Sequence, residues 1–386
     1  MGSNPFPAAG AAAAPADLPA ARRAAHVQGS LIREILKATM RPGMISLAGG
    51  LPAPQSFPAE ALRAAFDAVL ATEPAQALQY STTEGHPPLR EWIAAQESAR
   101  GVPTAAEQVL VVSGSQQALD LIGKAMVDEG QPLLVESPTY LGALQAFAPF
   151  GPALRQLPAD EAGLLPQAID GGLARGARLA YVMPSFQNPT GRTLGAERRS
   201  ALAQAARRFD LWLVEDDPYG ELWYREAPPA SLRLHAPERT LRVGSFLLAR
   251  LKQATDLHTA TLTQHVVARV LRDGLLDAQL PRVRRLYASR AAAMLAALRA
   301  HMPDGVRWTE PQGGMFVWLT VPAAVDTLRL LDRAIAAGVA FVPGAPFYAD
   351  SPRRDTLRLS FVTVPDETID RGVAILARLV NEEANR

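Results

Sequence analysis

The chain has 386 residues, of which 48% are hydrophobic and 20% charged, and its formal net charge is +1. That length allows one large domain and a smaller one, and the balanced, interleaved charge argues against nucleic-acid or anionic-membrane binding. The absence of cysteine excludes disulfides and thiolate chemistry, and the six histidines show no metal-binding spacing. Neither a membrane-length apolar run nor a signal-peptide layout is present, so we expect a soluble cytoplasmic protein without a metal.

The first two segments of the chain are expected to precede the large domain. Residues 1–23 are rich in alanine and proline and cannot bury an apolar face, which predicts a disordered leader. Residues 24–48 form an arm that we expect to pack with the small domain. Within it, apolar residues recur at helical spacing over Ala24–Thr39, and Pro42 closes the helix.

The rest of the chain predicts an α/β fold with two parts. Over residues 49–285, short apolar runs alternate with longer amphipathic segments, which is typical of a large domain with a mostly parallel, helix-covered sheet. Over residues 286–386 a smaller α+β domain is expected, with a helix, a GGMFVWL strand, a second helix and a TLRLSFV strand. The two helices are predicted over Arg290–Ala300 and from Val325 onward. The predicted strands of the large domain are Val109–Val112, Leu179–Met183, Leu211–Val214 and Leu241–Phe246.

Small or polar residues follow the first three of these strands. Because ligands bind beyond the carboxyl ends of parallel strands, these segments are expected to converge on one site. The first is SGSQQALD, in which Ser115 is expected to cap a helix with a buried N-terminus. Free N–H groups around Gly114, Ser115 and Gln116 would suit a phosphate, although an ordinary helix cap accounts for the same residues.

The other two segments carry an amide and three carboxylates. Asn188 precedes Pro189 and a Thr-Gly turn, which fixes its side chain at a strand-to-helix corner. The segment EDDPYGEL places Glu215, Asp216 and Asp217 at the end of an apolar strand. Glu215 or Asp217 can simply be solvated. A carboxylate that ends a buried strand needs a partner, however, so at least one is expected to serve a ligand.

Taken together and in order, these motifs resemble the fold-type-I aminotransferases that use pyridoxal 5'-phosphate. The shared motifs include SGSQQALD, SPTYLGA, QNPTGRTL, EDDPYGEL and TLRLSFV. MISLAGGLPAPQSFP, LQYSTTEGHPPLRE and KQATDLHTATLTQ are similar to the subgroup that contains kynurenine and 2-aminoadipate aminotransferases. The resemblance covers roughly residues 27 to 380.

The resemblance implies a cofactor shell. Ser115 and Gln116 would hold the cofactor phosphate and Tyr140 would stack on the pyridine ring. Asp216 would pair with the protonated ring nitrogen, which keeps the ring an electron sink. The remaining implied cofactor-binding residues are Asn188 and Tyr219 at the phenolic oxygen, Ser245 of the VGSF strand, and Tyr80, which would reach the phosphate of a neighbouring subunit.

The resemblance also implies a substrate site and a homodimer. Arg358 of LRLSF would bind the α-carboxylate of the substrate, for which a guanidinium group is geometrically matched. Gly50 would allow the substrate to approach closely. Arg33 is a second candidate carboxylate partner, and a solvated helix face is the alternative for it.

The sequence departs from the family after Phe246. In the family, the strand that resembles LRVGSF continues into a second serine, the Schiff-base lysine, a phosphate-binding arginine and a further strand inside the sheet. Here Ser245 and Phe246 run directly into LLARLKQATDLHT, and Leu248 stands at the position of the lysine. The missing strand should leave neighbouring sheet edges unpaired.

Three lysines exist in the sequence, and each resembles an ordinary family position. They are Lys37, Lys124 and Lys252, of which Lys252 is the nearest candidate to replace the missing group. The family lysine bonds to the cofactor and moves the substrate proton, so no catalytic residue is assigned and the chain is expected to lack activity. The sequence either omits a segment of an ordinary enzyme, carries a deletion or is a degenerate relative. The retained cofactor-facing residues favour the first two.

The implied function is transfer of an amino group between an α-amino acid and a 2-oxo acid by a ping-pong mechanism. Other pyridoxal-phosphate chemistry, such as that of a lyase or decarboxylase, remains an alternative because it uses a similar shell. The other alternative is a non-catalytic protein that binds the cofactor or an amino acid. The leader is too short for a winged helix and no basic patch accompanies it, which argues against a DNA-binding regulator.

Overall fold

The computed structural model describes residues 41–243 and 255–385, together with residues 21, 23, 24, 34, 35, 37, 39 and 252. Of the predicted helix over Ala24–Thr39, Glu34, Ile35, Lys37 and Thr39 are described as helical. Three predictions lie outside the described residues: Arg33, Ser245 and almost all of the leader at 1–23. The Leu248 position lies outside them as well.

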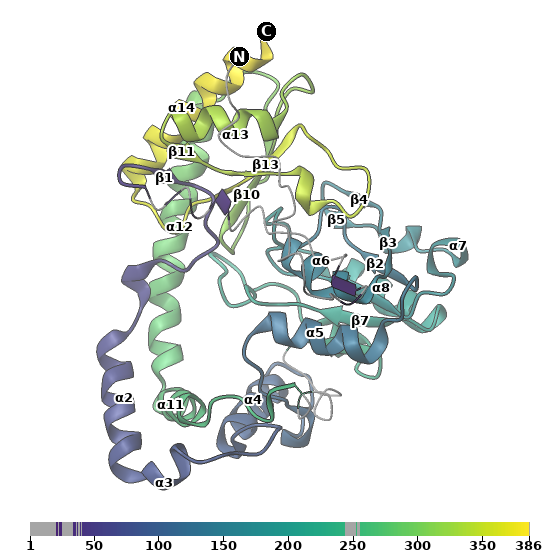
Figure 1. Cartoon of the computed structure of the whole chain (residues 1–386), viewed down its shortest axis with the longest axis vertical. Helices are drawn as coiled ribbons and strands as arrows, with labels where there is room; N and C mark the ends of the chain where they lie inside the picture. Colours follow the sequence, from purple (N-terminus) through teal and green to yellow (C-terminus); the bar gives the residue numbers. More distant parts are fainter. Residues whose placement is uncertain are drawn as a thin grey trace.

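A five-stranded parallel sheet is formed by segments between residues 132 and 242 (Figure 1). Its strands, in the spatial order β3-β2-β6-β7-β8, are Ala153–Gln156, Pro132–Val135, Leu179–Val182, Trp212–Glu215 and Thr240–Arg242. All four pairings are parallel, as expected for an α/β fold. Strands β6 and β7 confirm two of the predicted runs. Strand β8 overlaps the predicted run Leu241–Phe246 at Leu241 and Arg242, and residues 244–246 of that run lie outside the described residues. The sequence did not predict β2 and β3.

Helices cover both faces of this sheet, so its central strands are buried except for the first residues of β2 and β7. On one face, α5 (Ser115–Met126) and α6 (Leu141–Phe147) pack with Tyr181 and Val214 of the strands. On the other face, α8 (Ala196–Arg208) packs with Ala180 and Leu213. Because successive strand residues point to opposite faces, this alternation decides which side chains can meet above each strand.

The predicted strand at Val109–Val112 is wrong, because the structure forms no strand there. Its backbone is bonded to loops and side chains instead: the N–H of Val111 donates to the carbonyl of Glu84, at 2.9 Å. Within the described part of the chain, the backbones of Leu110 and Val112 have no hydrogen-bond partner, and β8 is the last strand on its side of the sheet. A strand requires a neighbour, and the described residues offer none there.

The C-terminal part contains a four-stranded antiparallel sheet, in the order β12-β13-β10-β9. These strands are Val342–Pro343, Thr356–Ser360, Phe316–Thr320 and Arg307–Trp308. The predicted GGMFVWL and TLRLSFV strands are confirmed as β10 and β13. The helices beside this sheet are α12 (Leu275–His301), α13 (Thr327–Ala336) and α14 (Asp366–Ala384). Asp326 begins α13 by accepting a hydrogen bond from the N–H of Leu328, at 2.9 Å.

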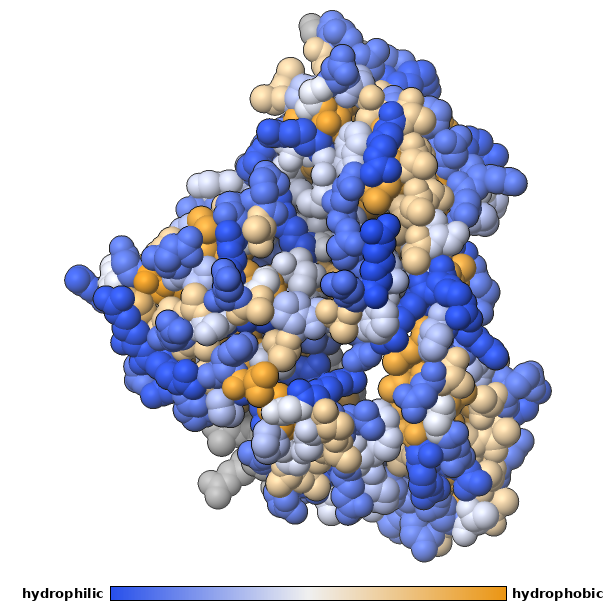
Figure 2. All heavy atoms as spheres, turned by 180° about the vertical axis from the view of Figure 1, so that it is seen from behind, coloured by the Kyte–Doolittle hydropathy of each residue, from blue (hydrophilic) through white to orange (hydrophobic). Residues whose placement is uncertain are grey.

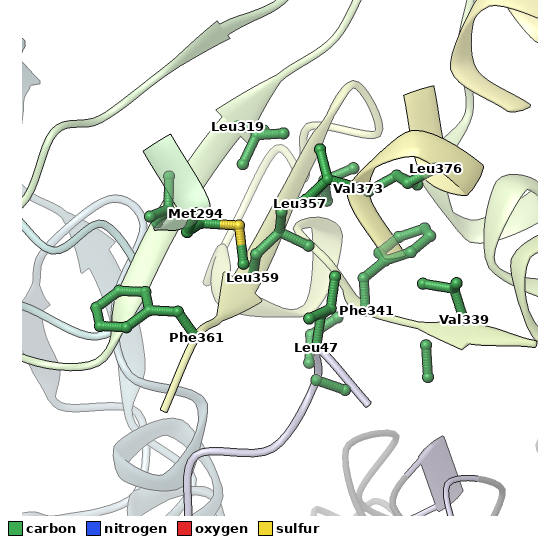
Figure 3. Packing of buried hydrophobic residues seen from close by; sticks show 14 of the residues in the cluster. Leu47, Met294, Leu319, Val339, Phe341, Leu357, Leu359, Phe361, Val373 and Leu376 are labelled. Carbon is green, nitrogen blue, oxygen red and sulfur yellow. The ribbon is translucent and has the colours of Figure 1, made fainter. Parts of the chain in front are cut away.

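The segment after residue 44 joins this C-terminal sheet region. Strand β1 (Ile45–Ser46) pairs in parallel with β11 (Val339–Ala340), and Leu47 lies fully buried in the same core as Leu357 and Leu359 (Figure 3). The helix predicted over Arg290–Ala300 is longer than expected. As α12 it begins at Leu275 and contains Pro281, so it runs through the predicted domain boundary at 285. The domain boundaries themselves remain a prediction.

Four of the remaining helices form a lobe that lies below the sheet in Figure 1. There α11 (Thr261–Arg272) packs against α2 (Ala59–Thr72) and α4 (Pro87–Ala99), with α3 (Pro74–Ala77) beside them. Figure 2 shows an opening through the molecule next to this lobe. The short elements are β4 (Ala159–Asp160), β5 (Gly163–Leu164), α7 (Gly171–Ala174) and α9 (Leu232–His235). No described helix is both long and apolar enough to cross a membrane.

Candidate functional site

Asp216 lies just beyond the carboxyl end of β7, where the sequence placed it. Its N–H donates to the carbonyl of Val182 at 2.9 Å, and its Oδ2 accepts a hydrogen bond from the Tyr181 hydroxyl at 2.7 Å. The side chain is 2% exposed, and burial raises its pKa to about 6. No described basic side chain forms an ion pair with Asp216. A buried carboxylate of this kind is suited to binding a cation.

The two neighbouring carboxylates have structural partners instead. Glu215 is fully buried on the opposite face of the sheet, where it accepts hydrogen bonds from the Ser231 hydroxyl and the N–H of Leu232. Asp217 forms an ion pair with Arg242 at 3.1 Å. The alternative that Glu215 is solvated is therefore wrong. Of the three carboxylates, only Asp216 is left without a cationic or backbone partner for its side chain among the described residues.

Asn188 is held by the turn that follows β6. It is 4% exposed, and its Oδ1 accepts a hydrogen bond from Nη1 of Arg358 at 2.8 Å. The hydroxyl of Tyr219 is hydrogen-bonded to the same Asn188 side chain, while burial raises the pKa of Tyr219. Asp216, Arg358 and Tyr140 are the other polar neighbours of Tyr219. The structure therefore brings together five side chains that the sequence had separated by up to 218 positions.

Arg358 reaches this cluster from β13 of the antiparallel sheet. Leu357 and Leu359 point into the helix-covered core (Figure 3), so the alternation of the strand directs Arg358 to the opposite face. There Nη2 donates to the carbonyl of Ala48 at 2.8 Å, and the guanidinium lies 4.2 Å from the ring centroid of Phe316. Burial lowers the pKa of Arg358 to about 10. Its buried Nε has no hydrogen-bond partner. This donor is therefore available to bind an anion.

Tyr140 and Gln116 meet above α6. The side-chain N–H of Gln116 lies 3.4 Å from the Tyr140 hydroxyl, and both approach Gly142. A Cβ atom at Gly142 would lie 2.3 Å from the Tyr140 ring and 2.4 Å from Gln116 Nε2. Gly142 therefore provides the space that lets these two side chains occupy one place.

The start of α5 differs from the prediction in two respects. Gly114, at φ 96°, is the N-cap and Ser115 is the first helical residue, without a capping side-chain bond. The glycine adopts this backbone angle without strain, but it has no side chain that could cap the helix. The helix start is also not buried, since Gly114 and Gln116 are exposed. Among the described residues, the N–H groups of Ser115 and Gln116 have no acceptor, which leaves them available for an anion.

Of two further predicted residues, Gly50 lies at the border of the cluster and Tyr80 lies away from it. Gly50 is exposed, and a Cβ there would lie 3.1 Å from the ring of Phe316, next to Arg358. Tyr80 is 77% exposed and makes an edge contact with His258, with ring centroids 5.4 Å apart. Its predicted role in a neighbouring subunit remains a prediction.

Every lysine of the sequence is engaged with a carboxylate. The pairs are Lys37 with Glu34, Lys124 with Asp120, and Lys252 with Asp256. Lys252 is fully buried, and the distance from its Nζ to Asp256 Oδ1 is 3.0 Å. Asp256 in turn accepts a hydrogen bond from Gln117 at 2.6 Å, which links Lys252 to helix α5 rather than to the cluster around Asp216.

Sequence reasoning missed Tyr181 and Phe316. Both lie inside apolar strand segments, where a tyrosine or phenylalanine is ordinarily a core residue. A signal existed for Tyr181, because a tyrosine in a buried strand needs a partner for its hydroxyl. No cluster of metal-binding side chains occurs in the described residues, and the site offers backbone N–H groups without acceptors, a buried carboxylate and a buried arginine instead.

Comparison with known proteins identifies similar chains. The family model for aminotransferase class I and II matches residues 43–249 and 246–376. The aromatic-amino-acid aminotransferase 1 of Thermococcus litoralis is 39% identical, with 94% of each chain covered. The 2-aminoadipate transaminase of Thermus thermophilus is 43% identical over 92% of this chain and 94% of that protein. The structure of an α-aminoadipate aminotransferase from Thermus thermophilus, complexed with N-(5'-phosphopyridoxyl)-L-leucine, has a TM-score of 0.87 at 40% identity and covers 95% of this chain and 98% of its own.

Two features of these matches bear on the region after Phe246. The family model matches the chain in two parts, which meet at residues 246–249. The alignment with the Thermococcus litoralis protein spans 396 positions, more than the 386 residues of this chain, although it covers only 94% of them. That relative therefore has residues that this chain lacks.

Proposed function

Since this chain belongs to the family of class I and II aminotransferases, we propose that its site serves amino-group transfer between an α-amino acid and a 2-oxo acid. The observation that supports this most directly is the cluster of Asn188, Asp216, Tyr219 and Arg358. In this cluster, the buried carboxylate of Asp216 can bind a cation and the buried guanidinium of Arg358 can bind an anion. An amino acid bound to a pyridine cofactor presents both charges.

Pyridoxal 5'-phosphate is the cofactor that family membership implies. The residues fit it: Asp216 has no cationic partner among the described residues, and the N–H groups at the start of α5 have no acceptor. When bound, this cofactor accepts the amino group and withdraws electrons from the substrate α-carbon. Asp216 would bind the ring nitrogen, Ser115 and Gln116 the phosphate, and Asn188 with Tyr219 the phenolic oxygen.

Arg358 would bind the substrate α-carboxylate. Its Nε is free, and its neighbours Asn188 and Phe316 hold the guanidinium in one orientation. An arginine held in this way loses little conformational entropy when it binds an anion. Burial strengthens the resulting ion pair, because the surroundings exclude water. Gly50 leaves room for the substrate next to Phe316.

The step that this chain is not equipped for is proton transfer at the α-carbon. That step needs a basic side chain at the cofactor, and all three lysines are paired with carboxylates elsewhere. We therefore propose that the chain binds the cofactor and the substrate but does not turn over. In a relative that has the segment missing here after Phe246, that segment would contain the lysine.

We further propose that the chain forms a homodimer through the lobe that contains α2. Several large apolar side chains are exposed in and around this lobe, which is unusual for a surface that faces water. They are Leu51, Phe57, Phe66, Leu70, Leu78 and Tyr80. Apolar residues are visible over the corresponding lobe in Figure 2. Sedimentation would test this, and a monomer at micromolar concentration would contradict it.

The experiment that tests the proposed function is an insertion. The block that the 2-aminoadipate transaminase carries at this place would be inserted after Phe246, and production of a 2-oxo acid from an amino acid would be measured. We expect no product from the original chain and product from the chain with the insertion, without release of carbon dioxide. Carbon dioxide would instead indicate a decarboxylase, and ammonia released together with the 2-oxo acid would indicate a lyase.

The second candidate function is non-catalytic binding of the cofactor or an amino acid. It is favoured by the absence of an available lysine together with the intact anion and cation positions. In that case the original chain would bind pyridoxal 5'-phosphate with an affinity that an amino acid changes. The chain with the insertion would then gain no activity.

A further inference from the structure

Tyr181 and Asp216 lie on one face of the parallel sheet. Tyr181 of β6 is opposite Val214 of β7, and Asp216 follows Val214 by two residues. Because strand side chains alternate, Asp216 continues the face on which Tyr181 and Val214 lie. The same face carries α5 and α6, which present Gln116 and Tyr140. The Tyr181 hydroxyl can therefore reach Asp216 from within the sheet.

Both side chains are buried and the hydrogen bond between them is short. Tyr181 is fully buried and its ring packs at an angle against Phe147, with centroids 6.2 Å apart. Its hydroxyl donates to Oδ2 of Asp216 at 2.7 Å. The other charged or titratable groups that face the pair are Asp217, Glu136, Tyr140 and Tyr219, and none of them is basic. The hydroxyl is thus the one described side-chain donor to this carboxylate.

We propose that Tyr181 is a positioning residue for the cofactor, which acts by fixing Oδ2 of Asp216 and leaving Oδ1 for the ring nitrogen. The inference rests on the proposed function. A hydrogen bond to a carboxylate favours its ionised form and opposes the effect of burial. Without the hydroxyl, Asp216 would be free to rotate and would hold a proton more readily, and both changes would weaken its pairing with a protonated pyridine.

The first test is Tyr181→Phe, which removes one oxygen atom and keeps the ring. We expect the affinity for pyridoxal 5'-phosphate at pH 7 to fall roughly tenfold, the usual size for a hydrogen bond to a charged group. Tyr224→Phe is the matched control, because its largely buried hydroxyl donates to a backbone carbonyl, that of Gly314, at 2.8 Å. The control should bind the cofactor as the original protein does. Equal affinity in all three proteins would overturn the inference.

A double-mutant cycle separates this inference from the proposed function. In an Asp216→Asn background, Tyr181→Phe should cause no further loss of affinity, because the tyrosine acts through the carboxylate. If Tyr181→Phe weakens binding equally in both backgrounds, Tyr181 has a structural role only and the inference is wrong. If Asp216→Asn itself leaves affinity unchanged, the site assignment and with it the proposed function fail.

A measurement on the unsubstituted protein covers the case in which Tyr181→Phe does not fold. Infrared difference spectroscopy during a pH titration would follow the carboxyl band of Asp216 and the C–O band of tyrosine. We expect a tyrosine band to shift as Asp216 titrates, since the hydroxyl donates to that carboxylate. A carboxyl titration with no accompanying tyrosine shift would contradict the inference.

Discussion

Nη1 of Arg358 lies 2.8 Å from Oδ1 of Asn188, although the two residues are 170 positions apart in the chain. Asn188 follows a strand of the parallel sheet, and Arg358 is in the middle of a strand of the antiparallel sheet. This contact joins the proposed cofactor pocket to the proposed carboxylate pocket. Asn188 is also hydrogen-bonded to Tyr219. A substitution of Arg358 should therefore affect both cofactor binding and carboxylate binding.

Arg358→Gln should weaken the binding of 2-oxoglutarate to the cofactor-loaded protein by roughly 10- to 100-fold, since a charge-assisted pair is lost. Isothermal titration calorimetry would measure this. Arg353→Gln is the control, because Arg353 is half-exposed and pairs with Asp355 at 2.6 Å. Comparable losses in both variants would show that general positive charge, and not the pocket, binds the ligand.

Asp216→Asn should reduce the affinity for pyridoxal 5'-phosphate at least tenfold, because a neutral amide cannot balance a protonated ring nitrogen. Equilibrium dialysis at pH 7 is a suitable measurement. Asp120→Asn on α5 provides the control, since Asp120 forms a surface pair with Lys124. Unchanged affinity in Asp216→Asn would count against the assignment of this carboxylate to the cofactor.

Gly142→Ala should disturb the cofactor pocket without removing a polar group. The new Cβ would lie 2.3 Å from the Tyr140 ring, and both Tyr140 and Gln116 would have to move. Since these are the far ends of side chains, we expect weaker cofactor binding with little change in melting temperature. Gly195→Ala, with nothing within 4 Å of its Cβ, is the control and should leave cofactor binding unchanged.

The unfolding free energy of the cofactor-free protein should fall as the pH rises from about 4 to about 7. Burial raises the pKa of Glu136 to about 7 and that of Asp216 to about 6. A carboxyl whose pKa is raised by folding stabilises the protein below the unfolded pKa and loses that contribution as it ionises in the folded state. Urea unfolding at several pH values would measure the fall.

Glu136→Gln tests the origin of this pH dependence. The amide oxygen can still accept the hydrogen bond from the N–H of Met183, which is 2.8 Å long in the original protein. The variant should match the original stability at pH 4 and exceed it at pH 8, by an amount on the order of 3 kcal/mol. The exposed Glu107→Gln should show no such difference. If the unfolding free energy of Glu136→Gln fell with pH as much as that of the original protein, the pH dependence would come from other groups.

Borohydride reduction in the presence of pyridoxal 5'-phosphate should trap no adduct on any lysine, because all three are paired with carboxylates and none belongs to the cluster. Peptide mass spectrometry would detect an adduct if one formed. A labelled peptide that contains Lys252 would show that this buried lysine leaves Asp256 and reaches the cofactor. The chain with the inserted block should be trapped at the inserted lysine.

The sequence by itself determined the class of the fold and the place of the candidate site. Asn188 and Asp216 follow apolar runs, and the carboxyl ends of parallel strands meet at one edge, so their convergence followed from local pattern. The departure after Phe246 was likewise visible in the order of the motifs. Those features depend on residue types at short spacing, which a single chain displays directly.

Only the tertiary structure decided which side chains act together. It assigned Glu215 and Asp217 to structural partners, paired Asp216 with Tyr181, and joined Arg358 to Asn188. It also showed that Val109–Val112 forms no strand in the described chain, although its composition predicts one. Strand pairing and burial depend on residues far away in the sequence, and the neighbour that this segment needs is not among those the structure describes.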